Sequence, residues 1–143
     1  MTSDLGFCPR VADPTADTVG LWVNPGITLD CQGHTITGPG DQLKNSFGVR
    51  VGMASSPTPA ENAVVTNCSV TKFWWGVYVQ NASGAVVDGN HLYANGWMAP
   101  DENGNGYGLN VSGSQNITVR NNRIDSNGNE GFHLSDSTGV AVE

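Results

Sequence analysis

The chain has 143 residues, enough for about one domain, and its 13 acidic and 6 basic residues give a net charge of −7. This charge argues against a nucleic-acid partner, because a phosphate backbone is recognised by clustered Lys and Arg. No run of 18 apolar residues occurs, so no membrane span is expected, and the first residues have neither the basic nor the apolar region of a signal peptide.

Residues 1–22, which contain Pro9 and Pro14, are expected to form a lead-in that covers the first turn of a repeat domain at 23–143. Two interpretations of the three cysteines stay open. Cys8 and Cys31 would form a disulfide that ties the lead-in to the first turn of an exported protein, or Cys8, Cys31 and Cys68 would all be small buried apolar residues. No cysteine and histidine spacing indicates zinc.

From residue 27 onward the chain repeats a unit of short apolar segments separated by Asn, Gly, Ser and Asp. The clearest copy is V-x-N-N-x-I at 119–124, preceded by copies at 87–92 and 65–70 and by a looser copy at 27–36. Each copy is followed by a strand that begins with glycine: Gly48–Val51, Gly76–Val79, Gly108–Val111 and Gly131–Leu134. Residues 139–142 begin a fifth copy. Alternating apolar and polar residues between Asn-Gly turns predict strands, and no helical periodicity is present.

The repeat is 22 residues long from Val65 to Val87 and 23 from Val119 to Val142, while residues 87–119 hold an inserted loop. This period, with three short strands per turn, predicts an all-β single-stranded parallel β-helix of about four turns plus the start of a fifth; the leucine-rich repeat pattern is missing. Inward residues should then stack in three columns: Val65/Val87/Val119, Val70/Leu92/Ile124 and Val51/Val79/Val111/Leu134. Four asparagines are candidates for an inward ladder of amides: Asn67, Asn90, Asn121 and Asn122.

The P-G-I-T-L-D-C-Q-G-H-T-I-T-G segment at 25–38 and the repeated V-x-N-N-x-I-x-x-N-G units resemble right-handed parallel β-helix proteins of the pectin-lyase-like superfamily. Within it they are most similar to domains described as NosD-like or as carbohydrate-binding and sugar-hydrolase domains. The resemblance covers roughly residues 23–143 and implies the right-handed fold. It leaves the function open, because the same scaffold hosts lyases, hydrolases, epimerases, adhesins and tailspikes.

One residue of each glycine-led strand is expected to face outward, which gives a column of Arg50, Tyr78, Asn110 and His133 beside an expected floor of glycines. At about 4.8 Å per turn, the column would span roughly 15 Å, or a few sugar units. Lyase or epimerase chemistry on a uronate needs a group that neutralises the carboxylate, a base for the C5 proton and an acid. Arg50 or Asn110 would neutralise, His133 would be the base and Tyr78 the acid. Sugar binding without chemistry, and an ordinary solvated surface, are the alternatives.

The motifs of known catalytic families are missing. The chain has no Asp-Pro-His motif like that of alginate epimerases, no Arg-x-Pro-x-x-Arg like that of pectate lyases and no paired aspartates like those of polygalacturonases. Carboxylate pairs for glycoside hydrolysis would have to come from Asp30 with Asp88 or from Asp125 with Asp136. No catalytic residue of these families can therefore be carried over to this chain.

The inserted loop contains D-E-N-G-N-G at 101–106, which places oxygen ligands at alternate positions and suits Ca²⁺. Position 12 of this pattern is Ser112 rather than a bidentate Glu, so the segment is not an EF-hand. A weak calcium site formed by Asp101, Asn103 and Asn105 is one interpretation, and a solvated turn-rich loop is the other.

Aromatic residues and a glutamine near the same strands are candidate sugar contacts: Trp74, Trp75, Trp97 and Gln80. Adjacent Trp74 and Trp75 cannot both face inward on a strand, so one is expected to be exposed, as a sugar-stacking platform or a subunit contact. Packing under the loop at 97–107 is the alternative.

Both ends are expected to be cut from a longer solenoid, or the open C-terminal turn is covered by a second copy or another segment. The favoured function is extracellular, cell-surface or periplasmic recognition of a polysaccharide, with lyase or epimerase activity on a uronate glycan as a further possibility. The rival is a non-enzymatic structural or adhesive β-helix that assembles through its open ends and its aromatics.

Overall fold

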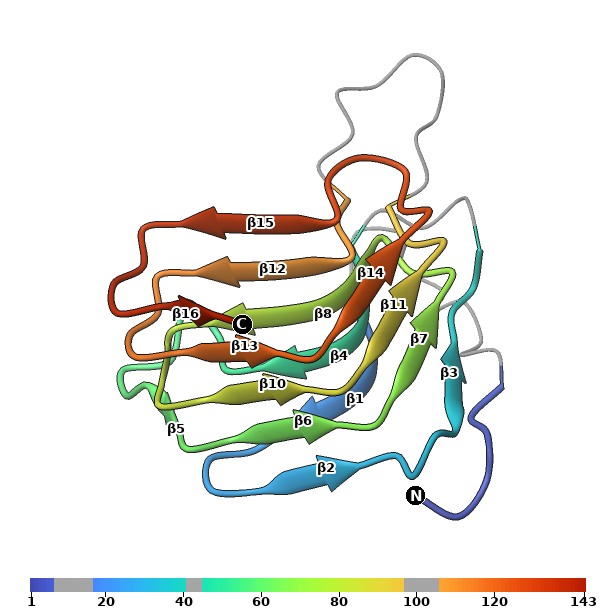
Figure 1. Cartoon of the computed structure of the whole chain (residues 1–143). Helices are drawn as coiled ribbons and strands as arrows, with labels where there is room; N and C mark the ends of the chain where they lie inside the picture. Colours follow the sequence, from blue (N-terminus) through green and yellow to red (C-terminus); the bar gives the residue numbers. More distant parts are fainter. Residues whose placement is uncertain (7–16, 41–44, 97–105) are drawn as a thin grey trace.

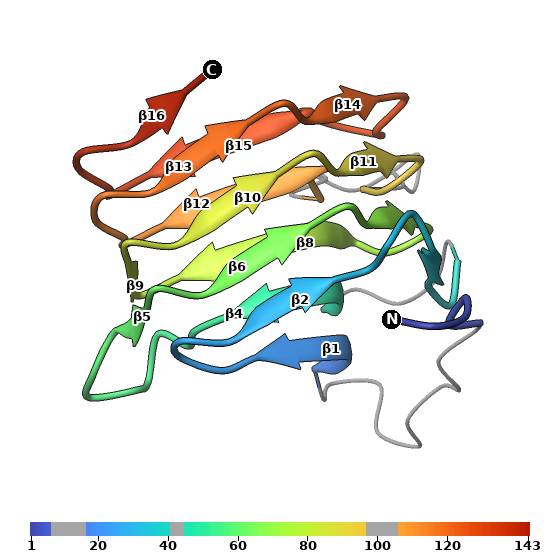
Figure 2. The same ribbon diagram turned by 60° about the horizontal axis from the view of Figure 1, so that its bottom comes forward.

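The computed structural model describes residues 1–6, 17–40, 45–96 and 106–143, and these residues form strands and turns without a helix. The strands stack into three parallel sheets that surround one core (Figures 1 and 2). The first sheet contains β1 (Thr18–Val23), β4 (Ser46–Val51), β8 (Trp75–Gln80), β12 (Leu109–Ser112) and β15 (Phe132–Ser135). Because every pairing between strands is parallel, the predicted parallel β-helix is confirmed.

The other two sheets complete each turn of the coil. The second sheet contains β2 (Thr28–Asp30), β6 (Val64–Thr66), β10 (Val86–Asp88), β13 (Thr118–Arg120) and β16 (Ala141–Val142). The third contains β3 (Thr35–Thr37), β7 (Ser69–Thr71), β11 (His91–Tyr93) and β14 (Arg123–Asp125). A short pair at one corner is formed by β5 (Ala60–Glu61) and β9 (Ala82–Ser83).

The core consists of the inward columns that the repeat predicts. Val65, Val87 and Val119 pair across the second sheet, and Leu92 pairs with Val70 and Ile124 in the third. In the first sheet, Val51, Val79, Val111 and Leu134 stack, and the first three are at most 1% exposed whereas Leu134 at the last strand is 46% exposed. Short alternating segments form strands here because the turns above and below supply both the backbone partners and the apolar cover.

The residues of the lead-in contribute to the coil. β1 pairs with β4 as the first strand of the first sheet, so the sheet includes residues that precede the predicted boundary at 23. Leu5 forms a bridge with Ile36, and its N–H donates to the Thr35 carbonyl at 2.9 Å. The stretch 1–6 therefore lies along the edge of the third sheet.

The predicted asparagine ladder is formed by two of its four candidates, Asn90 and Asn122. Asn67 and Asn121 adopt positive φ and are exposed, and their amides donate to Asp30 and Asp88. Among the four candidates, only Asn90 and Asn122 point inward, because each of them follows a residue with positive φ and turns back into the core. Asn90 Oδ1 accepts from the Cys68 N–H at 2.9 Å, and its Nδ2 donates to Asn122 Oδ1 at 3.0 Å.

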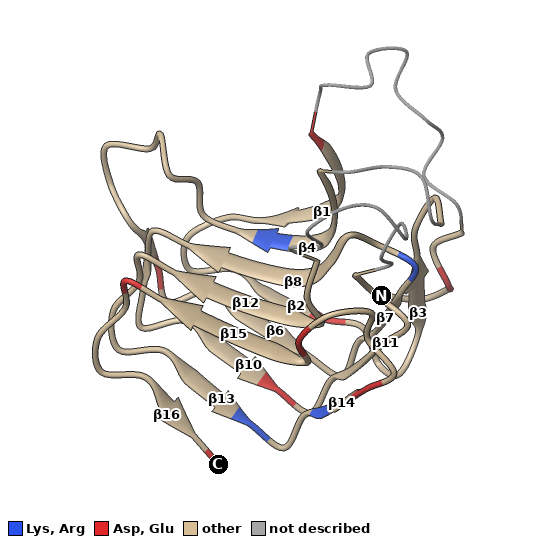
Figure 3. Cartoon of the chain, turned by 90° about the horizontal axis from the view of Figure 1, so that it is seen from above, with Lys and Arg blue, Asp and Glu red and all other residues tan. Residues whose placement is uncertain are grey.

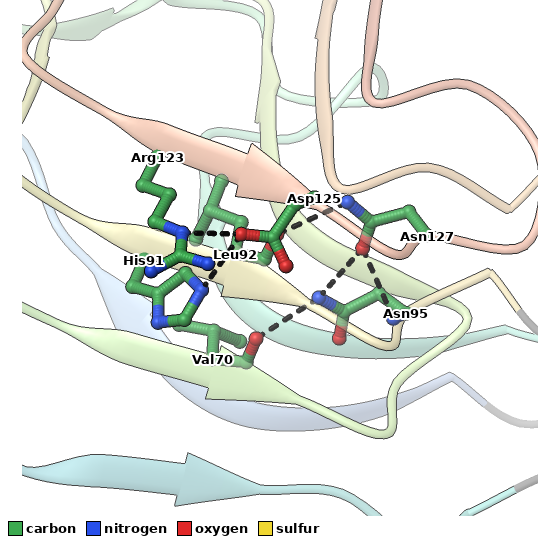
Figure 4. Close-up of polar contacts among 7 residues, drawn as sticks. All are labelled: Val70, His91, Leu92, Asn95, Arg123, Asp125 and Asn127. Atoms are coloured by element: carbon green, nitrogen blue, oxygen red, sulfur yellow. Dashed lines mark hydrogen bonds and ion pairs between the residues drawn. The ribbon is translucent and has the colours of Figure 1, made fainter.

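Two further ladders occupy the remaining corners. Asn95 Nδ2 donates to the Val70 carbonyl and to Asn127 Oδ1, as Figure 4 shows. At the third corner, Ser114 Oγ accepts from the Ala82 N–H at 3.2 Å, and the Ser114 N–H donates to Ser137 Oγ at 3.0 Å. In the turns above β8, buried Asn and Ser side chains thus bond to the backbone of the turn below.

The disulfide differs from both interpretations of the cysteines. Cys31 is bonded to Cys68 at a sequence separation of 37, so the predicted Cys8–Cys31 bond is wrong. Cys8 itself lies outside the described residues. Both bonded cysteines are buried, and Cys68 occupies the corner position that Asn90 and Asn122 hold in later turns. The bond is possible because the parallel register stacks these corners directly on one another.

Candidate functional site

The outer face of the first sheet carries the predicted column in register. Arg50 pairs with Tyr78, Asn110 pairs with Tyr78 and with His133, and Trp22 extends the column below Arg50. We call these five residues the outer column: Trp22, Arg50, Tyr78, Asn110 and His133. Each of the four predicted residues lies between two inward apolar residues of its strand, so its side chain faces outward. The parallel register of the four strands then brings these side chains together.

The outer column is less exposed than its position suggests. Arg50 is 6% exposed and Asn110 is 7% exposed, while Tyr78 and His133 are half-buried. The column is therefore not a row of freely solvated side chains, and its polar groups are held by neighbours on the same face.

A second row of side chains lies beside the outer column and precedes each glycine-led strand. It contains Phe47, Trp75, Tyr107 and Glu130, each directly before a glycine of the first sheet. Phe47 stacks on Trp75 with ring centroids 4.6 Å apart, and Trp75 lies 5.8 Å from Tyr78. The two rows thus interlock through aromatic contacts, which accounts for the burial of the face.

Arg50 is held on all sides. Its Nη1 donates to Asp17 Oδ2 at 2.5 Å and its Nη2 donates to Gln80 Oε1 at 3.3 Å. Its guanidinium also lies 4.4 Å from the centre of the Phe47 ring and 4.9 Å from that of Trp22. A substrate carboxylate would have to replace Asp17 to reach this guanidinium. Figure 3 shows a blue, basic segment in β4, which lies between β1 and β8 in the first sheet.

Three polar atoms of this face are buried without a hydrogen-bond partner in the described part of the chain. They are Arg50 Nε, Trp75 Nε1 and Asn110 Oδ1. A buried donor or acceptor normally finds a partner, and leaving one unpaired costs about 1–3 kcal/mol. The two donors and the acceptor are covered by neighbouring side chains, so a ligand hydroxyl, which both donates and accepts, would pair with them only where a neighbouring side chain moves aside.

His133 belongs to a small polar cluster at the upper end of the outer column. Its Nδ1 lies 2.8 Å from Glu130 Oε2, and its ring is stacked on Tyr107 with centroids 4.4 Å apart. Glu130 orients the imidazole so that Nε2 is the ring nitrogen left for proton transfer. A histidine held in this way has the arrangement of a general base.

The two tyrosines of the face keep their protons. Burial raises the pKa of the Tyr78 phenol above its ordinary value of 10.0, although the hydrogen bond with Ser112 opposes part of this effect. Burial, and secondarily the charge of Glu130, raise the pKa of Tyr107 as well. Both phenols are therefore neutral near pH 7, the state required of a proton donor.

The glycines of the first sheet do not form an open floor beside the column. A Cβ on Gly48 would lie 2.3 Å from Val70 Cγ1, and one on Gly76 would lie 2.5 Å from the Gly108 carbonyl oxygen. These glycines face the interior, where strand and corner approach too closely for any side chain. The expectation of a shallow outer floor is therefore wrong.

The remaining sugar-contact candidates differ in their surroundings. Trp74 and Trp75 are both half-buried and meet edge to face, so neither is the fully exposed platform that was expected. Gln80 accepts from Arg50 and from the Ala54 N–H at 3.2 Å, which links the column to the loop after β4.

Trp97 and the calcium candidates Asp101, Asn103 and Asn105 lie outside the described residues. Within the described ranges, no group of three or more His, Cys, Asp or Glu residues is placed to hold a metal.

The carboxylates considered for glycoside hydrolysis are engaged elsewhere. Asp88 is bonded to Arg120 and Asn121, and Asp125 to Arg123 and His91, as Figure 4 shows for the latter. Hydrogen bonds, from Asn121 for Asp88 and from Arg123 for Asp125, hold the pKa of both carboxyls below the ordinary value of 3.8. Neither would carry the proton that a general acid donates.

Sequence reasoning did not identify four residues of this face: Trp22, Phe47, Tyr107 and Glu130. A usable signal was present, because three of them directly precede a glycine of the repeating strands, where Trp75 also lies. Trp22 was assigned to the lead-in and could be found only after β1 was placed in the sheet.

Residues 19–143 match the family model described as "Right handed beta helix region". No curated protein and no solved structure matches the chain. In the described part of the chain, no helix has the length and apolar character needed to cross a membrane.

Proposed function

Because the chain belongs to the right-handed β-helix family, a fold common in polysaccharide-active proteins, we propose that it recognises a polysaccharide across the outer face of its first sheet. The observation that carries this proposal is the face itself. Aromatic rings lie beside the buried, unpaired polar atoms Trp75 Nε1 and Asn110 Oδ1. Sugar rings present both C–H faces and hydroxyls, and this surface offers partners for each.

The location that fits this function is outside the cytoplasm. The Cys31–Cys68 disulfide is buried and links two turns of the coil. Disulfides of this structural kind persist mainly in secreted, periplasmic or cell-surface proteins. The disulfide thus supports an exported protein, as the polysaccharide proposal requires.

His133 and its neighbours favour a second candidate, lyase or epimerase activity on a uronate glycan. In β-elimination, His133 Nε2 would take the C5 proton, the C4–O bond would break and a C4=C5 double bond would form. Tyr78 would return a proton to the leaving oxygen, so the reaction needs no oxidant or further reactant. The Asn110 amide nitrogen Nδ2 would donate to the substrate carboxylate, because Arg50 is occupied by Asp17.

A test of both candidates starts with retention of the full chain on immobilised neutral and uronate polysaccharides. Ultraviolet detection of unsaturated uronide in the same samples reports elimination. Parallel samples with Ca²⁺ and with a chelator test the proposed site at Asp101, Asn103 and Asn105. Retention by at least one polysaccharide is the expected result, and absence of retention across the panel would reject the recognition proposal.

The chain offers a matched control for the catalytic candidate. His133 and His91 are both half-buried and paired with a carboxylate, but they lie on different sheets. If His133 is the base, His133→Gln lowers turnover by about 100-fold or more while His91→Gln leaves it unchanged. Equal activity of both variants and the unmodified chain would contradict the assigned role of His133.

The rival function, a structural or adhesive module, is distinguished by size measurement. Assembly through the ends of the coil would give species whose mass grows with concentration, whereas polysaccharide recognition requires only a discrete particle. The exposed Leu134 and Val142 at the last strands are the residues that favour this rival. Light scattering over a hundredfold concentration range separates the two.

A further inference from the structure

A hollow of about 430 Å³ lies where β1 and β4 end, next to the lower end of the outer column. Trp22 lines it together with residues of the loop after β4, among them Met53, Ser55 and Thr58. Small-molecule sites are of this size and combine apolar surface with a few polar groups. Neither the sequence pattern nor the family assigns a role to this hollow.

Trp22 is the most prominent side chain of the hollow. It is 45% exposed, although it belongs to a sheet whose other large side chains are mostly covered. The Arg50 guanidinium lies 4.9 Å from its ring centroid, and that guanidinium is itself fixed by Asp17 and Gln80. The indole is therefore supported on one side, so a ligand that stacks on its exposed surface would lose little side-chain freedom.

The facing loop is anchored to the next turn of the coil. Asn81 Nδ2 donates to the carbonyls of Met53 and Ser56, at 3.2 and 2.9 Å. The Ala54 N–H donates to Gln80 Oε1, which also accepts from Arg50. The loop residues that line the hollow are consequently fixed in place, and the same Gln80 links them to the outer column.

The chemistry of the hollow selects an uncharged ligand. Every described residue that lines it is uncharged, and Asn24, Ser55 and Thr58 supply polar side chains. The nearest guanidinium, Arg50, is already paired with a carboxylate. A charged ligand would find no counter-ion, whereas a neutral sugar can place C–H groups on the indole and hydroxyls against the loop.

We propose that Trp22 and the loop after β4 form a subsite for one neutral pyranose unit of a glycan. This inference rests on the proposed function and extends it: the bound glycan continues past Arg50 by one turn and carries an uncharged sugar at that end. A uronate unit, if the glycan has one, would then lie further up the outer column, near Asn110.

Isothermal titration of the full chain with defined hexasaccharides tests the subsite, with cello-, xylo- and mannohexaose as neutral probes and hexagalacturonate as the charged one. For the neutral probe that binds best, Trp22→Ala is expected to weaken affinity about tenfold, and Trp22→Phe by much less. Ile27→Ala is the control, because Ile27 is 52% exposed but does not line the hollow.

A second variant keeps the test decisive if Trp22→Ala fails to fold. Ser55→Trp adds a large side chain from an exposed loop position and fills the hollow without altering the sheet. Weaker binding by Ser55→Trp, with Ile27→Ala unaffected, supports the subsite. The subsite is wrong if a hexasaccharide binds the unmodified chain and binds Ser55→Trp, Trp22→Phe and any folded Trp22→Ala with the same affinity. Recognition by the outer face would stand in that case. If no probe binds at all, the proposed function fails and the subsite with it.

Discussion

Successive turns of this coil fill the same three corners with different chemistry. The turn that contains β6, β7 and β8 has apolar corners, whereas the two turns above it have polar ones. The apolar corners are Cys68, Phe73 and Ala82, and the polar corners are Asn90, Asn95 and Ser114, followed by Asn122, Asn127 and Ser137. The strands of the apolar and the polar turns pair in the same parallel register. The change from apolar to polar corner residues must therefore reflect which backbone groups each corner side chain has to bond.

The bonds to the turn below explain the change. In the first turn, which has two additional residues at its corner, backbone amides reach backbone carbonyls directly. Cys31 N donates to the Thr66 carbonyl at 3.0 Å and Gly38 N to the Thr71 carbonyl at 2.9 Å. In the next turn, the N–H groups of Cys68, Phe73 and Ala82 have no such carbonyl and bond to side-chain oxygens of the turn above. Polar corners are therefore needed only where the turn below leaves amides to be satisfied.

Replacing Asn90 is expected to have the largest effect on stability. Asn90 is 2% exposed, and Asn90→Leu would leave the Cys68 N–H and the Val65 carbonyl without their partners. Two or three buried groups at about 1–3 kcal/mol each predict a loss of about 4 kcal/mol in the free energy of unfolding. Urea unfolding measures this loss. Asn67→Gly is the control, because Asn67 is exposed, adopts positive φ and bonds only at the surface; a loss as large as that of Asn90→Leu would refute the distinction.

Removing the Cys31–Cys68 bond is expected to cost about 3 kcal/mol, since it closes a long loop in the unfolded chain. The measurement is the urea midpoint of Cys31→Ala combined with Cys68→Ala, compared with the unmodified chain. A sharper variant combines Cys31→Ala with Cys68→Asn, which places an amide at the corner below Asn90 and Asn122. Because the amides of the first turn already bond to backbone carbonyls, the new side chain would be buried without these partners, and this variant should lose about a further 1 kcal/mol relative to the double alanine variant. A gain in stability with asparagine would show instead that the first turn leaves amides to be satisfied.

Acidification is expected to have the smallest effect, and it should act through surface carboxylates rather than the ladders. Backbone or side-chain hydrogen bonds lower the pKa of Asp4, Asp30, Asp88 and Asp125 below the ordinary value of 3.8. Carboxyls with a lowered folded-state pKa stabilise the fold above their unfolded pKa, and this contribution disappears as pH falls through the folded value. Urea midpoints should therefore be flat near neutrality and fall below about pH 4. In Asp88→Asn the fall should be smaller; an unchanged fall would remove Asp88 from this account.

Much of the fold could be read from the sequence because the repeat is dense. The spacings from Val65 to Val87 and from Val119 to Val142 indicate the period, and the glycine-led strands indicate the register that brings Tyr78 and Asn110 together. The inward residues at the corners could not be predicted in the same way. Asn67 and Asn90 both belong to Asn-rich turns. Which of them points inward depends on the positive φ of Asn67, and the amino-acid sequence does not show that backbone angle.

The site was predictable in position but not in environment. Alternation along a strand places Arg50 outward, yet it cannot show that Asp17, far away in the chain, neutralises it. The pairing of Cys31 with Cys68 likewise follows from the stacking of two corners and not from their spacing in sequence. Tyr107 and Glu130 became part of the site only once their positions before the glycines were seen to lie beside the outer column.

Glycan recognition by the outer face of the first sheet is tested most directly by nuclear magnetic resonance of the ¹⁵N-labelled chain titrated with the oligosaccharides above. We expect the indole N–H signals of Trp22 and Trp75 and the side-chain amide signal of Asn110 to shift together, while signals of His91 and Arg123 on the third sheet stay unchanged. Shifts that gather on the third sheet, or no shift with any oligosaccharide, would contradict recognition of a glycan by the outer face of the first sheet.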